Sequence, residues 1–84
     1  MSNASDRKYI VNLMDEVDNA FKEDDRRLAH HLIQEVGVYY NHEWGNAPTH
    51  VLDRLAGWKS NLGESTGWIH FIICKREGIR FEYH

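Results

Sequence analysis

Six histidines are the side chains of this sequence best suited to acid–base or metal chemistry. His31 and Glu35 are four residues apart, so they share one face of a helix and form a two-ligand pair. His42, Glu43 and His50 bracket a loop, which is a pattern that acid–base cleavage of RNA could use. A zinc site needs three or four ligands in tetrahedral array, and the sequence has neither an HExxH motif nor a second cysteine. We therefore predict no catalytic residue, no metal and no cofactor, and keep a small metal- or His/Glu-dependent hydrolase or nuclease as the third alternative.

The single cysteine, Cys74, lies inside a predicted strand, where a thiol is a small buried hydrophobe more often than a nucleophile. One cysteine permits no internal disulfide, which indicates a reducing compartment. No apolar stretch approaches the length of a membrane helix, and the polar residues 1–8 do not begin a signal peptide. We therefore expect a cytoplasmic protein with no membrane partner.

The elements that would position these side chains begin with two helices. Residues 6–22 place apolar side chains at helical spacing, with Ser5 as N-cap. Asp24 or Asp25 caps a second helix, which ends at Gly37, where glycine can adopt a positive φ. The apolar stripes of these two helices are Ile10, Leu13, Met14, Val17, Phe21, Leu28, Ala29, Leu32, Ile33 and Val36.

The next elements are a strand and a third helix. Residues 38–44 alternate between two sets of β-prone side chains, which predicts a short strand. The competing interpretation extends the second helix through Gly37 to Tyr40. After Pro48, Thr49 caps a third helix that ends at Gly63.

The last elements are the two strands of a predicted β-hairpin. Residues 68–74 are rich in β-branched and aromatic side chains, and residues 79–83 alternate cleanly. Between them, Gly78 suits the left-handed position of a bulge-type hairpin loop. The 84 residues have room for one domain, so we predict a single α+β domain of order ααβαββ, with residues 1–5 flexible.

The first hairpin strand points to a protein partner because it is apolar on both faces. One layer of helices covers only one face of a sheet, so the other face needs a second cover. The predicted interface is Trp68, His70, Ile72 and Cys74, with Tyr40 and Trp44 from the middle segment. We therefore predict a non-enzymatic protein-interaction module, acting as a small regulator or inhibitor on a larger protein, with self-association through the hairpin as a further use.

The distribution of charged residues along the chain bears on whether the partner is a nucleic acid. Residues 1–45 hold nine acidic and five basic residues, and residues 46–84 hold four and five, so no dense basic face is expected. The alternative is a winged-helix-like DNA-binding regulator. In that interpretation the third helix and the hairpin tip would contact DNA through Arg54, Lys59, Lys75 and Arg76. The long connection between the second and third helices argues against it, so we expect nucleic acid not to be the partner.

Overall fold

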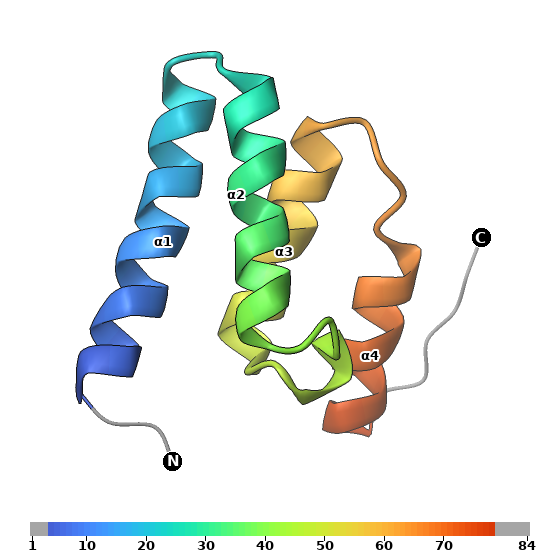
Figure 1. Ribbon diagram of the computed structural model, residues 1–84. Coiled ribbons are helices and arrows are strands. Elements are labelled where there is room, and N and C mark those ends of the chain that lie inside the picture. Colours follow the sequence, from blue (N-terminus) through green and yellow to red (C-terminus); the bar gives the residue numbers. More distant parts are fainter. Residues whose placement is uncertain (1–3, 79–84) are drawn as a thin grey trace. The chain divides into compact units, whose positions relative to one another are not determined.

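The computed structural model describes residues 4–78, and these residues form helices and turns with no strand. The elements in chain order are α1 (Ala4–Lys22), α2 (Arg26–Tyr39), the 3-10 turn η1 (Trp44–Asn46), α3 (Thr49–Asn61) and α4 (Gly67–Glu77), shown in Figure 1. They fall into two compact units, Met1–Glu43 and Trp44–His84. The predicted α+β class is therefore wrong for the described residues, because both segments predicted as strands between residues 38 and 74 are helix or turn.

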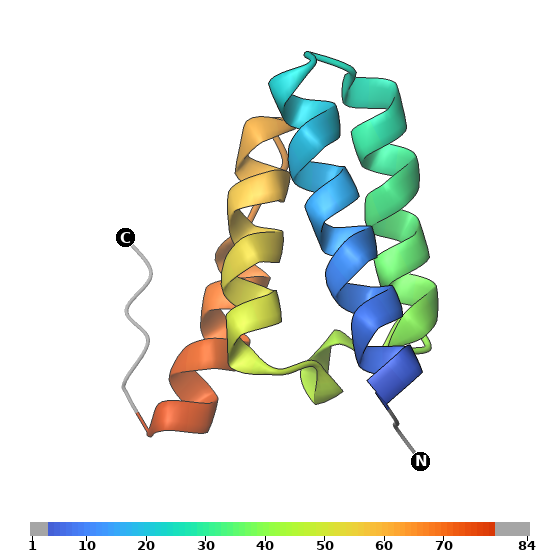
Figure 2. The same cartoon turned by 90° about the vertical axis from the view of Figure 1, so that its left-hand side faces the viewer.

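In the first unit, α1 and α2 pack side by side as an antiparallel helical hairpin (Figures 1 and 2). Asp24 reverses the chain with a φ of +57°, and the Asp25 N–H donates to the Ala20 carbonyl at 2.9 Å. The Leu28 N–H donates to Asp25 Oδ1 at 3.1 Å, so Asp25 is the N-cap of α2. This settles the choice between the two predicted caps.

Most residues of the predicted apolar stripes of α1 and α2 form the core of this unit, but Leu28 is exposed, and Phe21 and Leu32 are half-buried. The buried residues recur mostly at intervals of three or four, with Leu13 and Met14 adjacent, so each helix turns one face inward. The buried side chains of α1 and α2 are Ile10, Leu13, Met14, Val17, Ala20, Ala29, Ile33 and Val36. The helical periodicity predicted for these residues is confirmed.

The end of α2 differs from the main prediction. Gly37 is buried inside the helix, which continues to Tyr39, so the competing interpretation of a longer helix holds and the strand at residues 38–44 is wrong. Asn41 and His42 then take left-handed backbone conformations, and the His42 N–H donates to the Gly37 carbonyl at 2.7 Å. The β-branched and aromatic residues after Gly37 lose only a few tenths of a kcal/mol in a helix. That loss is smaller than the gain from continuing the helical hydrogen bonds.

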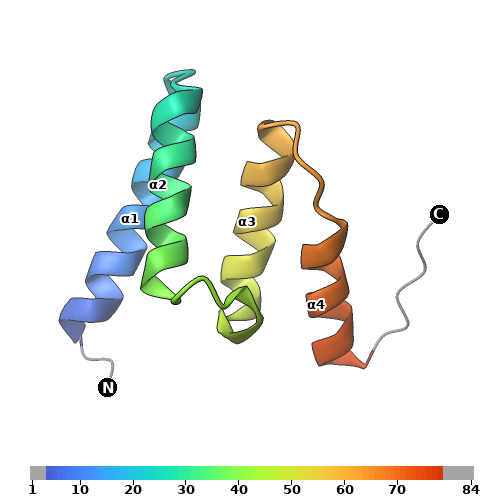
Figure 3. The same ribbon diagram turned by 45° about the vertical axis from the view of Figure 1, so that its right-hand side comes forward.

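In the second unit, η1 leads into α3, and α4 runs back antiparallel to α3 (Figure 3). Pro48 is the N-cap residue of α3 and makes no side-chain capping bond, so the prediction of Thr49 as cap is wrong by one residue. Pro48 suits this position because its fixed φ and missing N–H cost nothing ahead of the first turn. The buried side chains of α3 are Val51, Leu52, Leu55, Ala56 and Trp58.

Two glycines, Gly57 inside α3 and Gly63 just after it, have opposite conformational requirements. Gly63 follows the C-cap Leu62 with a φ of +77°, whereas Gly57 lies inside the helix, and an added Cβ meets nothing within 4 Å at either position. We expect Gly63→Ala to lower the free energy of unfolding by about 1–2 kcal/mol through backbone strain. Gly57→Ala is expected to raise it by about 0.5–1 kcal/mol through helix propensity. Urea unfolding measures both changes. Equal effects of the two substitutions would contradict the assignment of Gly57 to the helix and of Gly63 to a left-handed conformation after it.

The largest correction concerns residues 67–77, which form α4 instead of the first strand of a hairpin. Gly78 has the predicted left-handed conformation, with a φ of +70°, but it terminates a helix and its N–H donates to the Lys75 carbonyl at 3.4 Å. Lys75 and Arg76 occupy the last helical turn, where cations offset the helix dipole. Periodicity alone cannot distinguish a short apolar strand from a buried helix. The basic residues of the last turn and the left-handed glycine after it are both typical of a helix C-terminus. The second predicted strand, residues 79–83, lies outside the described residues.

Candidate interaction surface

The helical geometry of α4 regroups the side chains that were predicted to share one strand face. Successive residues of an α-helix are about 100° apart, so residues at i, i+3, i+4 and i+7 share one side. Trp68, Phe71, Ile72 and Lys75 have this spacing, and we call them the α4 row. Ile69 follows Trp68 and lies about 100° around the helix from it, and it is fully buried. α4 therefore has one side in the core and an apolar row on a neighbouring side.

The α4 row leaves two large aromatic side chains open to solvent. Trp68 is 42% exposed and Phe71 is 52% exposed, while Ile72, next to Phe71 in the chain, is half-buried. The unit's other tryptophan on a long helix, Trp58, is only 3% exposed. An exposed pair of aromatic residues at helical spacing is typical of a contact surface.

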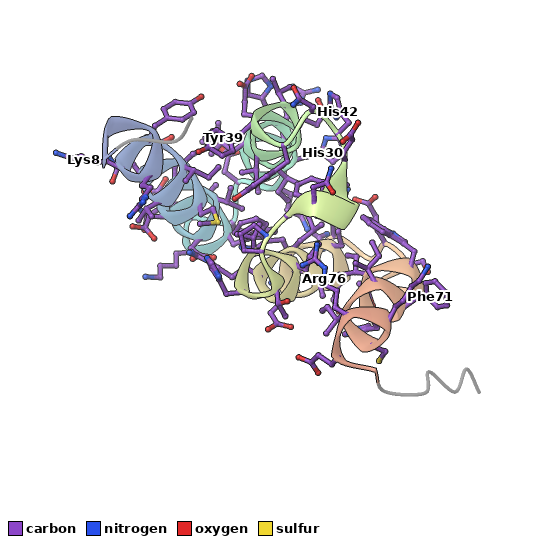
Figure 4. All side chains as sticks on the ribbon, turned by 90° about the horizontal axis from the view of Figure 1, so that it is seen from below. Lys8, His30, Tyr39, His42, Phe71 and Arg76 are labelled. Carbon is purple, nitrogen blue, oxygen red and sulfur yellow. The ribbon has the colours of Figure 1, made fainter. Side chains whose placement is uncertain are left out.

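A groove adjoins the α4 row. It is open, has a volume of about 370 Å³, and is lined by Gly45, Phe71, Ile72, Lys75 and Arg76. It thus lies between α4 and η1, within the second unit. Figure 4 shows Phe71 pointing outward from α4 and Arg76 pointing toward the 3-10 turn.

Arg76 fixes one wall of this groove. Its guanidinium donates to the Gly45 carbonyl and, at 3.5 Å, to Thr49 Oγ1. Hydrogen bonds from a charged donor are stronger than neutral ones, so they hold η1 and the start of α3 against the last turn of α4. The groove is therefore preformed by contacts within one unit.

The predicted interface residues are divided by the structure. Trp68 and Ile72 remain neighbours on α4, but the exposed His70 and the half-buried thiol of Cys74 lie on another side of the helix. The sequence-based interface did not include Phe71, and Lys75 was assigned to a DNA contact instead. Helical spacing from Trp68 would have found both residues.

The two remaining predicted interface residues belong to different units. Trp44 is half-buried in η1 of the second unit. Tyr40 is the C-cap residue that follows α2 in the first unit, and its ring lies 4.9 Å from that of Tyr39 in an edge-to-face arrangement. The Tyr39 ring lies 6.2 Å from that of Tyr9. Burial, and secondarily the neighbouring Tyr39, raise the pKa of the Tyr40 phenol above its usual 10.0, so Tyr40 is a neutral member of an aromatic cluster.

The basic residues of the DNA-binding alternative interact mostly within their own unit. The Arg54 guanidinium lies 5.5 Å from the centre of the Trp58 ring, and Lys59 Nζ lies 3.4 Å from Glu64 Oε1. Arg76 is held by the contacts described above. The residues predicted as the hairpin tip form the last turn of α4 instead. DNA binding therefore stays a prediction, and the β-hairpin that would have contacted the DNA is not formed by these residues.

Among the histidines of residues 4–78, the structure brings together only the predicted pair of His31 with Glu35. His31 Nε2 lies 3.8 Å from Glu35 Oε1 on the surface of α2. Within residues 4–78, no group of three or more His, Cys, Asp or Glu side chains is placed to hold a metal ion. The hydrolase alternative therefore has a pair of side chains in this part of the chain but no metal cluster to support it.

No protein-family model, curated protein or solved structure matches this chain. Of the helices that the structure describes, none has the length and apolar character required to cross a bilayer. Any functional conclusion must therefore come from the geometry of the chain itself.

Proposed function

We propose that this chain is a protein-interaction module that contacts its partner through the α4 row. The observation that carries the proposal is the exposure of Trp68 and Phe71 on one side of a helix that is fully buried at Ile69, on a neighbouring side. A helix that is apolar on nearly all sides is normally covered on all sides. Covering Trp68 and Phe71 with a partner would remove apolar area from water, which is the main driving force of association.

The α4 row differs from the other exposed apolar side chains of the described residues. Tyr9, Val11, Leu28 and Val38 are between 41% and 56% exposed. They are distributed over α1 and α2, and within each helix their spacing is two or ten residues, so they do not form a row at i, i+3 and i+4. Isolated exposed apolar residues are normal on protein surfaces, whereas adjacent aromatic anchors beside a groove are a feature of binding sites.

The function we propose is that of a small regulator or inhibitor, which acts by covering part of a larger protein. Aromatic side chains dominate the binding energy at such contacts. The preformed groove between α4 and η1 lowers the ordering cost of binding, because its walls need no rearrangement. The proposal assigns no reaction to the chain.

Selection from a random library of twelve-residue peptides displayed on phage tests this proposal. We expect enriched peptides to bind the wild-type chain and to lose about tenfold or more in affinity with Phe71→Ser. Trp68→Ser should weaken the same peptides. Val38→Ser, at an equally exposed position on α2, is the matched control and should leave binding within about twofold.

The result that would contradict the proposal is equal binding of the enriched peptides to the wild-type chain and to both α4 variants. A failure to enrich any peptide would also count against it. Far-UV circular dichroism of each variant distinguishes lost binding from lost folding. Because both aromatic side chains are exposed, the α4 variants should retain the wild-type helical signal.

A further inference from the structure

Resting on this proposed function, we infer that the partner segment bound by the α4 row carries a large apolar side chain next to one or more carboxylates. The α4 row begins with Trp68 and Phe71 and ends with Lys75, so one continuous side of the helix passes from aromatic to cationic. A ligand that matches this sequence of chemistry must be apolar at one end and anionic at the other.

The groove beside the row has the same two-part character. Phe71 and Ile72 form its apolar wall, and the charged residues that line it in the described part of the chain, Lys75 and Arg76, are both cationic. Glu77, the acidic residue of α4, is two positions from Lys75 and therefore about 200° away around the helix. The positive charge at this end of the row is thus not offset by an acid on the same side.

The two cations have different roles. Arg76 is committed to the Gly45 carbonyl and Thr49 Oγ1, so it shapes the groove. Lys75 is exposed and projects from the row itself. A lysine ammonium is a mobile point charge on a flexible stem, able to reach a carboxylate whose exact position varies among ligands. Lys75 is therefore the residue that selects for an acidic segment.

A second copy of this chain fits the α4 row less well than a peptide segment does. A fully covered aromatic side chain buries about 150–250 Å². Trp68 and Phe71, each about half exposed, therefore offer on the order of 200 Å², against the roughly 800 Å² per partner of a stable interface. An aromatic anchor in a groove is sufficient for a short segment, but this area is small for a dimer.

Nucleic acid fits the row less well for a different reason. Backbone phosphates require several cations along one surface, whereas the α4 row supplies Lys75 next to the apolar Phe71 and Ile72. Apolar side chains beside Lys75, with the second cation Arg76 engaged by Gly45 and Thr49, match an acidic peptide better than a phosphate backbone.

Two peptide libraries of fixed composition test the inference. Both contain twelve-residue peptides of apolar and small residues, one with Asp and Glu as its charged residues and the other with Lys and Arg. The wild-type chain should enrich binders from the acidic library at least tenfold over the basic one, and Lys75→Glu should reverse this preference. Lys22→Glu makes the same charge change at an exposed position on α1, and it should keep the wild-type preference.

Equal enrichment from both libraries, with binding still lost in Phe71→Ser, would overturn the acidic assignment while leaving the proposed function in place. An acidic preference that survives Lys75→Glu would also overturn it. Two other occupants would appear as different results. Concentration-dependent dimerisation abolished by Phe71→Ser, or salt-sensitive binding of a short DNA duplex abolished by Lys75→Glu, would each overturn the assignment to a peptide segment.

Discussion

Trp58→Ala is expected to lower the free energy of unfolding by about 3–5 kcal/mol, the usual cost of removing a buried aromatic side chain. Trp58 is 3% exposed and lies under the Arg54 guanidinium, so the substitution leaves a cavity and removes a cation–π contact. Trp68→Ala is the matched control, because Trp68 is 42% exposed. It should cost less than about 1 kcal/mol.

Urea unfolding followed by far-UV circular dichroism measures both tryptophan variants without relying on indole fluorescence. The difference between the two costs is the informative quantity, since both substitutions remove the same side chain. Equal costs would mean that Trp68 is as well covered as Trp58. That outcome would remove the main support for an exposed row on α4.

Ile69→Ala and Phe71→Ala form a second pair, two residues apart. Ile69 is fully buried, so its truncation is expected to lower the free energy of unfolding by about 2–5 kcal/mol. Phe71 is 52% exposed, so Phe71→Ala should cost less than about 1 kcal/mol. On a strand, residues two apart point to the same side, so the hairpin interpretation predicts similar and large costs for both.

The same urea titrations serve this second pair. A cost for Phe71→Ala that approaches the cost for Ile69→Ala would contradict the helical register of α4. The slope of unfolding free energy against urea concentration should be the same for both variants, because neither changes the surface exposed on unfolding appreciably.

Sequence patterns predicted the helices of the first unit well, because these helices have both a periodic apolar face and a capping residue at a chain reversal. In α1 and α2 the apolar residues recur at three and four, and Asp25 supplies a capping side chain at a reversal of the chain. These signals agree with each other. The boundary at Gly37 was wrong because a glycine inside a helix and a glycine after one look alike in sequence.

In the second unit, the sequence pattern of residues 68–74 does not distinguish a helix from a strand. Residues 68–74 are apolar at nearly every position, so the helical spacing of Trp68, Phe71 and Ile72 is hidden among other apolar residues. β-Propensity reflects packing on a half-buried surface more than any backbone preference, and it favoured a strand for this run. The left-handed conformation of Gly78 was predicted, but a hairpin loop and a helix C-terminus both use it.

The candidate site was predicted in part for the same reason. Trp68 and Ile72 are neighbours on either a strand face or a helix side, since residues four apart share a side in both geometries. Phe71 and Lys75 share that side only on a helix, so a prediction of strand could not include them. The contact of Arg76 with Gly45, which shapes the groove, joins residues 31 positions apart and leaves no local signal.

Every proposal above depends on residues 67–77 forming a helix with Ile69 buried and Phe71 exposed. Backbone NMR assignment of the full chain measures this secondary structure. We predict positive Cα secondary shifts throughout residues 67–77, with Hα contacts to the amide three residues ahead. Negative Cα shifts over residues 68–74, together with cross-strand contacts to residues 79–83, would mean that this segment is a strand and that the α4 row does not exist.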